Sequence, residues 1–549
     1  MREVQEELRA ATSNAGVTTP QCDETFKSTV AGALMDLSSV PFSAVKRLVQ
    51  NYVEVHRPQY PCVSASLVEN IVDRIRSEVD DTNTFFSSGK PATSGLGHFE
   101  YFVLFITLAI SAMTLTWADE NQARSASEAF FGSAKKHLQA LDDNDEIQAL
   151  QISLLLVHYA QQCPERADNW TCISHAIRIV LDLGLHKGSP DALSLADQRQ
   201  RRQLFWVAYG MERSLCSVLR LPLSFSEESI STPPPADFRP DHLFTSDDIE
   251  KESSANHIYL YRALETEAHR VLHLEHDLEI FRHVDVSDWI SDISSRLARW
   301  YAKAQSYTQY NMLEFKHVQY NHLLLRLHRP TPRLRVRSDE DRRIVLDASA
   351  ALIEDYLSQE RRRRLFYPFH GAHILFEAAA ISLEACWWLK GAAEPLRSVL
   401  EQMLCTAVPN CLDLLTKMGR RWNAAQVSAK RLRPILADVT AACGFANYEN
   451  DGQSASAISD EVAIVQQLEN LLFPDGPLIW DTLPSGEQDS WAAILGTGNT
   501  NFADGNDVFF DDLELFSWQP NWGLVFDDAS TISNPGVNLE GRSLNGLQF

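Results

Sequence analysis

The sequence predicts an all-α protein: a large multi-helical domain of two connected helical blocks, followed by an acidic C-terminal tail. Apolar residues recur every three or four positions through most of residues 41–447, which is typical of helices, whereas strand-like alternation is rare. After residue 448 the composition changes, and from 474 Gly, Asn, Ser, Pro and Asp dominate. Such a segment cannot bury enough apolar surface to fold alone, so we expect a disordered or partly ordered tail.

The first block extends from about residue 41 to residue 230. Residues 1–40 are rich in Thr, Ser, Gly and Asn, which predicts a weakly structured leader. The stretch Tyr101–Ala118 has eighteen residues without a charge, the lower limit for crossing a membrane. Acids flank it and no Lys or Arg bias accompanies it, so we interpret it as a buried core helix and expect no membrane association.

The clearest helical periodicity lies at 170–184 and 204–218. In the first segment an apolar stripe runs from Trp170 to Gly184, where glycine is expected to end the helix. In the second, Pro222 is expected to end the helix.

A proline-rich loop at 231–241 separates this block from the second, at about 250–447. The helical segments expected there are 256–281, 286–328, 340–359, 369–390, 395–418 and 422–443. Residues 448–473 are interpreted as a linker with one more short helix at 457–473.

Charge and cysteine content exclude several classes of protein. The net charge is −24, and residues 450–549 hold sixteen acids against one base, Arg542. A negative chain repels the phosphate backbone of DNA. The nine cysteines never form C-x-x-C, so no zinc ribbon or disulfide framework is predicted, and a reducing compartment is favoured. Phosphate-binding, nucleophile-elbow and metalloprotease motifs are absent, so we expect no enzyme, no catalytic residues and no cofactor.

Histidines form the remaining constellations. His269, His273 and His276 share one helix face at a spacing that suits metal ligands, but no second helix offers a matching partner. A solvated polar face is therefore expected. Cys172 and His175 also lack a second pair. His370 and His373, which flank Gly371, are expected to make local hydrogen bonds.

Four segments, in this order, resemble the fungal-specific transcription factor domain, the middle homology region of zinc binuclear cluster regulators. They are HRPQYPCVS (56–64), NWTCISHAIRIVLDLGLHKGS (169–189), RQRRQLFWVAYGMERSLCSVLRLPLSF (199–225) and HLLLRLHRPTP (322–332). Two positions depart from the family pattern: Glu212 stands where the family has Asp, and Arg220-Leu221 where it has Gly-Arg.

The resemblance implies a structural role for the motif residues. These are Asp182, Gly184, His186, Arg202, Trp206, Tyr209, Arg213 and Pro222. Large aromatic residues are expected to be buried where helices cross: Trp170, Phe205, Trp206 and Tyr209. Arg201, Arg202 and Arg213 are expected to pair with Glu212 or Asp182, or to cap helix C-termini. Arg178 and Asp182 are expected to pair weakly, and His186 to satisfy carbonyls at a helix end.

The resemblance also implies a six-cysteine zinc cluster before this domain, and only Cys22 and Cys62 occur in the first 150 residues. Zinc is therefore expected only if such a cluster precedes Met1. Three explanations stay open: a regulator without the cluster that reaches DNA through a partner, a gene model that has lost its first exon, or a protein that acts as a dominant-negative or as a co-regulator. The partner expected is a DNA-binding protein or a second copy of the chain in a homodimer.

The tail interleaves large apolar side chains with seven acids over residues 502–528. The residues expected to contact transcriptional coactivators or mediator-like surfaces are Phe509, Phe510, Leu513, Leu515, Phe516, Trp518, Trp522 and Phe526. The alternative is a tail that packs back on the helical body, favoured by its four tryptophans.

The resemblance and the tail favour a nuclear transcription regulator, and the resemblance implies a pathway-specific activator of metabolic or secondary-metabolite genes. The basic run Arg361–Arg364 could serve nuclear import, or it could be a solvated helix end paired with Glu354, Asp355 or Glu360. The alternative function is a helical scaffold or ligand-sensing co-regulator that does not bind DNA directly.

Overall fold

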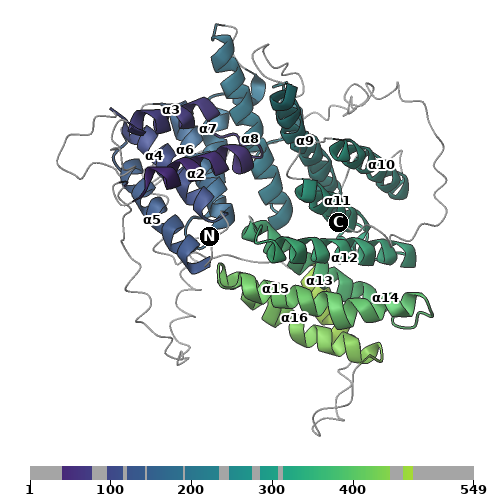
Figure 1. The fold of residues 1–549 in the computed structure, drawn as a ribbon. Coiled ribbons are helices and arrows are strands. Elements are labelled where there is room, and N and C mark those ends of the chain that lie inside the picture. The colour runs from purple at the N-terminus through teal and green to yellow at the C-terminus, as the bar shows by residue number, and fades with distance from the viewer. Residues whose placement is uncertain are drawn as a thin grey trace, which may run out of the picture. The chain divides into compact units, whose positions relative to one another are not determined.

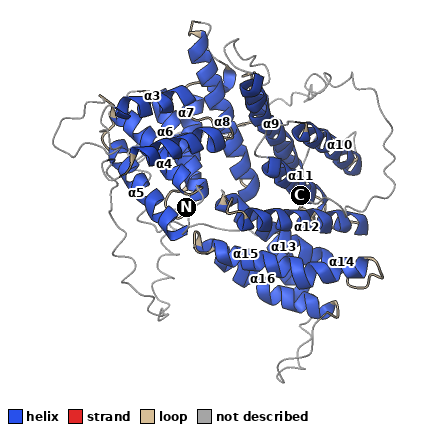
Figure 2. Cartoon of the chain, in the orientation of Figure 1, coloured by secondary structure: helices blue, strands red, loops and turns tan. Residues whose placement is uncertain are grey.

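The computed structural model describes residue 37 and residues 40–76, 95–114, 120–141, 145–188, 192–233, 246–274, 285–306, 313–365, 367–445 and 461–473. The regular elements in these ranges are all helices (Figure 2). The predicted all-α class is confirmed. The predicted leader up to residue 36, residues 446–460 of the linker, and the tail from residue 474 lie outside the described residues.

The first half of the domain contains the helices predicted at 101–118, 170–184 and 204–218, together with others for which no bounds were predicted (Figure 1). The elements are α2 (Phe42–Asn51), the π-helical turn η2 (Tyr52–His56), α3 (Ala65–Ile75), α4 (His98–Ala112), α5 (Glu120–Leu138), α6 (Glu146–Gln162), α7 (Asn169–Asp182), the 3-10 turn η4 (Leu185–Lys187), α8 (Leu195–Leu219) and the 3-10 turn η5 (Glu227–Ser229). Side-chain oxygens of Ser64, Asp145, Asp168 and Ser194 accept a first-turn backbone N–H at the start of α3, α6, α7 and α8. These caps explain where the four helices begin.

The second half consists of longer helices. They are α9 (Ser246–His269) with the π-helical turn η7 (Arg270–Leu274), α10 (Val286–Gln305), α11 (Leu313–His328), α12 (Asp339–Arg361), α13 (Pro368–Trp388), α14 (Leu396–Gln402) with the π-helical turn η9 (Met403–Ala407), α15 (Val408–Met418), α16 (Asn423–Ala442) and α17 (Glu461–Leu472). Each helical segment predicted after residue 250 has a counterpart here. The short helix predicted within 457–473 is α17.

Three helices form the centre of the core. In α4 every residue from Phe102 to Ala112 is buried, and α6 and α13 are buried over most of their length. Helix α4 packs against α5 and α6, and α13 packs against α12, α15 and α16. No helix in the described ranges is long and apolar enough to cross a bilayer. The uncharged stretch at 101–118 is a core helix as predicted, up to Thr114, where the described part ends.

Helix α8 joins the two predicted blocks. It contacts α6 and α7 of the first block and α9 and α13 of the second. Gly210 allows the approach of α9, since a Cβ atom there would lie 3.2 Å from Cε1 of Tyr259. The described residues of both blocks belong to one compact unit.

One predicted core residue is on the surface. Trp170, expected to be buried at a helix crossing, is 39% exposed, and Leu181 on the same helix is 37% exposed. The buried stripe of α7 is formed by Cys172, Ile173, Ala176, Ile177 and Val180. Trp170 lies at the edge of this stripe, on the exposed side of α7 that also carries Arg178 and Leu181, whereas Asn169, one residue earlier, is buried.

Candidate functional site

The motif residues at the end of α7 form a tight corner. Gly184 has φ = 64° and ends the helix in the left-handed conformation that glycine tolerates best. The backbone carbonyl of His186 accepts hydrogen bonds from the N–H groups of Ser231 and Thr232, at 2.9 and 3.2 Å. The prediction that the His186 side chain caps carbonyls is wrong: Nδ1 is buried and bonded to no described residue. On the exposed side, Arg178 and Asp182 form the expected weak pair, 3.7 Å apart.

Arg213 is the fully buried centre of the motif on α8. Its Nη1 donates to Glu212 at 2.5 Å, its Nε to Glu227 at 2.9 Å and its Nη2 to the carbonyl of Phe225 at 2.9 Å. Burial alone would lower the pKa of Arg213, but the charge of Glu212 beside it raises that pKa above its usual value. Glu212 also accepts the backbone N–H of Ser224 at 2.8 Å. The predicted Arg213–Glu212 pair is present, although Glu212 replaces the family's Asp.

Two aromatic residues on the same face of α8 act with Arg213. Trp206 Nε1 donates to the carbonyl of Pro233 at 2.7 Å, and Tyr209 OH donates to Glu227 at 3.2 Å. The guanidinium of Arg213 also lies 4.8 Å from the centre of the Tyr209 ring. Together they fasten the segment 221–233 along α8. Of the other motif residues, Pro222 is exposed in that segment and Arg202 is half-buried on α8.

A second polar centre lies around Glu377, a buried carboxylate on α13. Arg329 donates to Glu377 Oε1, and Arg220 Nη2 and Arg326 Nε lie 3.4 Å from its oxygens. His322 Nε2 is 2.9 Å from Oε2. Burial would raise the pKa of Glu377, but the charges of Arg326 and Arg329 hold it well below its usual value. We call Arg220, Arg326, Arg329 and Glu377 the arginine cluster.

The arginine cluster continues into α9. Arg326 lies 3.9 Å from Glu265, which itself binds Arg262 at 2.5 Å. Arg326 is fixed from the other side by Ser217, whose hydroxyl and backbone carbonyl accept its two Nη groups. The cluster therefore connects α8, α9, α11 and α13.

The histidines of α9 and η7 do not form the solvated polar face that was predicted. His269 is 2% exposed, and its Nε2 lies 2.9 Å from the carbonyl of Leu221. Burial lowers the pKa of His269 to about 4 and that of His273 well below its usual value. The periodic spacing of these histidines predicted a solvent-exposed face. That face is buried because α9 packs against α8 and α11. His276 lies outside the described residues, and no group of described side chains could hold a metal ion.

The histidines beside Gly371 also differ from the prediction. His370 Nε2 lies 2.8 Å from the hydroxyl of Ser214, which is 156 residues away, so this hydrogen bond is not local. Both ring nitrogens of His373 are buried and bonded to no described residue. Cys172 is a buried free thiol, and His175 Nδ1 lies 2.8 Å from Ser153 Oγ.

Arg220 has an unusual backbone for its residue type. It caps α8 with φ = 57° and ψ = 38°, the left-handed conformation, at a position where the resembled family has Gly. A side chain in this conformation costs on the order of 1 kcal/mol. Here the guanidinium offsets that cost, because Nη1 donates to the carbonyl of Leu472 at 2.8 Å and Nη2 reaches Glu377. This contact with α17 was not predicted from the sequence.

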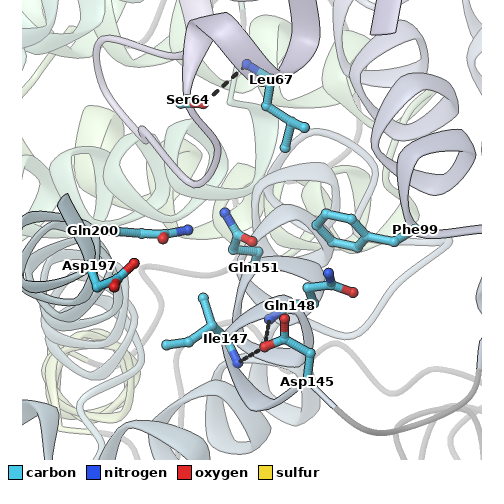
Figure 3. A pocket seen from close by; sticks show the side chains of 9 residues that line it. All are labelled: Ser64, Leu67, Phe99, Asp145, Ile147, Gln148, Gln151, Asp197 and Gln200. Atoms are coloured by element: carbon cyan, nitrogen blue, oxygen red, sulfur yellow. Dashed lines mark hydrogen bonds between the residues drawn. The ribbon is translucent and has the colours of Figure 1, made fainter. Parts of the chain in front are cut away.

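A shallow pocket of about 350 Å³ lies where the first turns of α3, α4, α6 and α8 meet (Figure 3). Its lining residues are Ser64, Leu67, Phe99, Asp145, Ile147, Gln148, Gln151, Asp197 and Gln200. Three of its polar groups already serve the helices: Ser64, Asp145 and the Asp197 backbone take part in N-terminal caps. Gln151 donates to the carbonyl of Cys62 at 3.2 Å. The pocket is therefore mainly a junction of helix caps.

The predicted activation residues cannot be placed. Phe509, Phe510, Leu513, Leu515, Phe516, Trp518, Trp522 and Phe526 all lie outside the described residues. The functional geometry that can be described belongs to α8 and the helices around it.

Comparison with known proteins identifies this region. The model of the fungal specific transcription factor domain matches residues 49–302. Pyrimidine pathway regulatory protein 1 of Saccharomyces cerevisiae is 25% identical over 300 residues, which are 51% of this chain and 33% of that protein. Positive regulator of purine utilization of Emericella nidulans is 22% identical over 350 residues, 47% of this chain and 33% of that protein. An ABC-transporter-regulating transcription factor of Aspergillus fumigatus is 27% identical over 101 residues, 18% of this chain and 11% of that protein.

This chain thus spans about a third or less of the length of each of these relatives. The matched residues 49–302 contain the corner at Gly184, the Arg213 centre and the helix cap at Arg220. Residues 49–302 of this chain are therefore a fungal specific transcription factor domain.

Proposed function

We propose that this protein is a nuclear transcription regulator, and more narrowly a pathway-specific activator of metabolic genes. The observation that carries the proposal is the fungal specific transcription factor domain at residues 49–302. Two relatives named as regulators of pyrimidine and purine pathways support the metabolic assignment. Under this proposal the helical domain is the scaffold, and the acidic-aromatic tail makes the contact with coactivators.

The tail supports an activating role through its composition. Residues 474–549 contain many acids and a single base, Arg542, so this segment is attracted to basic surfaces. The interleaved Phe, Trp and Leu side chains supply apolar contact area in a shallow groove. Acidic-aromatic segments that become ordered on binding lose conformational entropy, and they therefore bind weakly and reversibly.

The direct test fuses residues 474–549 to a foreign DNA-binding domain and measures a reporter gene. We expect activation, and we expect its loss when Phe510, Phe516, Trp518 and Trp522 are replaced by Ala. A matched variant with Ser517, Asn521 and Ser530 replaced by Ala keeps every acid and aromatic residue and is expected to stay active. A fusion without reporter activity would refute the activating role of the tail.

Nuclear import is proposed to use the basic run Arg361–Arg364. All four side chains are exposed at the end of α12, and Arg361 pairs with Glu354 at 2.5 Å. Replacing all four by Gln in the fluorescently tagged full chain is expected to abolish nuclear accumulation. Arg343→Gln, an exposed cation elsewhere on α12, should leave it unchanged. A wild-type chain that stays cytoplasmic under all growth conditions would favour a helical scaffold instead.

DNA contact is proposed to come from outside the described helices. A partner protein, a homodimer with DNA-binding segments, or a six-cysteine zinc cluster would each supply it. Chromatin immunoprecipitation of the tagged chain, before and after depletion of co-purifying DNA-binding proteins, separates recruitment through a partner from direct binding. Binding that survives depletion would rule out recruitment.

A further inference from the structure

The arginine cluster has more positive than negative charge in a buried setting. Its three guanidinium groups, of Arg220, Arg326 and Arg329, face the single carboxylate of Glu377. In the adjoining pair, Arg262 and Glu265 compensate each other. The side chains of Arg326 and Arg329 are 4% and 1% exposed. Water screens such charges poorly, so two uncompensated positive charges here are costly.

The neighbouring ion pairs do not supply the missing negative charge. Glu384 is buried on the same helix and its charge acts on Arg329, but Arg342 lies 3.7 Å from it and burial raises its pKa to about 7, so it compensates the cluster only in part. Asp341 is shared by His328 and Arg337, at 2.7 and 3.6 Å. Among the described residues, no carboxylate other than Glu265 and Glu377 lies within 4 Å of a guanidinium group of the cluster.

Neutral hydrogen-bond acceptors compensate the excess positive charge only in part. The carbonyl of Leu472 accepts from Arg220 Nη1 at 2.8 Å and from Arg329 Nη2 at 2.9 Å. As the last residue of α17, Leu472 offers the partial negative charge of a helix C-terminus. This favours cations but does not neutralise two of them.

Three buried nitrogen atoms in this region form no hydrogen bond with any described residue. They are Arg220 Nε, Arg326 Nε and His273 Nε2. Arg326 Nε lies 3.4 Å from Glu377 without forming a hydrogen bond to it. The charges of Arg220, Arg326 and Arg329 all act on His273, and with burial they lower its pKa. Burial and the charge of Arg329 likewise lower the pKa of Arg220 to about 9. Buried donors without acceptors are rare in proteins and mark places where an acceptor is missing.

We propose that the arginine cluster is a binding site for a small anion, which accepts hydrogen bonds from Arg220 and Arg326 beneath the C-terminus of α17. Phosphate, sulfate and the carboxylates of small metabolites share the required chemistry: they carry full negative charge and several acceptor oxygens. The site does not depend on the activating role proposed for the tail.

The anion is expected to bind beside α17 and not to replace it. Helix α17 buries Ile464, Leu468, Leu471 and Leu472 against the domain, so its displacement would expose four large apolar side chains. Binding at the Nε atoms of Arg220 and Arg326 is expected to leave the Leu472 carbonyl with its two donors. Bound anion should therefore stabilise α17 together with the domain core.

The test uses the full chain and its thermal unfolding at constant ionic strength. Phosphate, sulfate and malonate are titrated separately, and chloride keeps the ionic strength equal. A ligand that binds only the folded state raises Tm with a saturable dependence on its concentration. We expect such a rise, and the oxyanion with the lowest half-saturating concentration identifies the source. Equal, non-saturating responses to all anions would overturn the proposal.

Arg220→Gly is the informative variant because it removes the donor while restoring a residue suited to φ = 57°. It should raise the half-saturating phosphate concentration at least about tenfold, because the loss of one charge-assisted hydrogen bond weakens binding by about that factor. Arg343→Gln removes an exposed cation outside the cluster and should respond like wild type.

Equilibrium dialysis with labelled phosphate measures binding to the wild-type chain directly, without reference to any variant. Wild-type protein should take up close to one phosphate per chain. Arg220→Lys, which keeps the charge and loses Nε, should bind more weakly. No saturable uptake by the wild-type chain would refute the site.

Discussion

The guanidinium of Arg220 donates to the carbonyl of Leu472 at 2.8 Å, across 252 residues of sequence. This bond ties the end of α8 to the end of α17, and Arg329 donates to the same oxygen at 2.9 Å. Helix α17 also packs against α13 and α16. It therefore belongs to the folded domain, although 41–447 was predicted as the domain and 448–473 as a linker with a short helix.

The first prediction concerns the packing of α17. Leu468 is 2% exposed, so Leu468→Ala should lower the free energy of unfolding by about 2–4 kcal/mol through lost apolar burial and a residual cavity. Val427→Ala, on α16 at 54% exposure, should change it by less than about 0.5 kcal/mol. Chemical denaturation of both variants measures the difference. Equal effects would show that α17 is not an integral part of the domain.

The second prediction compares a buried and an exposed arginine. Arg213→Ala removes three hydrogen-bond partners and leaves Glu212, which is 1% exposed, without its cation. We expect a loss of about 3–5 kcal/mol in the free energy of unfolding, typical of breaking a buried ion pair.

Arg178→Ala is the matched control. Arg178 and Asp182 are 58% and 63% exposed and 3.7 Å apart, so this change should cost at most about 0.5 kcal/mol. If Arg213→Ala proved as mild as Arg178→Ala, the Arg213 centre would not be what fastens the segment 221–233.

The sequence predicted most of the helices because their apolar spacing and caps are local signals. Gly184 and Pro222 marked helix ends near the observed ones, and the uncharged stretch around α4 was correctly placed in the core. The prediction for Trp170 was wrong because periodicity shows the apolar face of a helix, but not how far around the helix its neighbours cover that face.

The arginine cluster could not be predicted in the same way. Its members lie on α8, α11 and α13, and only the tertiary fold brings them together. Two signals were present: Glu377 stands in an otherwise apolar helix, and Arg326 and Arg329 are one helical turn apart. Neither signal shows which residues lie beside these side chains in the fold. His269 and His273 were therefore predicted on a solvated face.

The third prediction is an acid-sensitive fold. Burial lowers the pKa of His56 and His373 to about 3 and that of His257 and His269 to about 4. Below about pH 6.5 these histidines are protonated in the unfolded chain but stay neutral in the folded chain. Stability contributed by the neutral histidines is therefore present above pH 6.5 and lost as pH falls towards 4. Each should contribute a slope of up to about 1.4 kcal/mol per pH unit.

Two histidine variants test the sign of this effect. His373→Leu should flatten the decline in the free energy of unfolding between pH 6.5 and 4, because one buried titrating group is gone. His317→Gln should not flatten it. The hydrogen bond that His317 donates to Asp355 raises the pKa of His317, so its contribution is present below pH 6.5 and lost as pH rises. A pH profile unchanged by His373→Leu would contradict the assignment of a neutral, buried imidazole.

The fourth prediction isolates backbone conformation at the corner of the family motif. A Cβ atom at Gly184 would meet nothing within 4 Å, so Gly184→Ala tests the cost of φ = 64° alone. We expect a loss of about 1 kcal/mol in the free energy of unfolding. Gly391 is also in open space, but its φ is outside the left-handed region. Gly391→Ala should therefore be neutral or slightly stabilising, since alanine restricts the unfolded chain. Neither substitution creates a clash. A difference of about 1 kcal/mol between the two variants in chemical denaturation would therefore come from the left-handed turn itself. Equal effects would show that the corner tolerates a side chain.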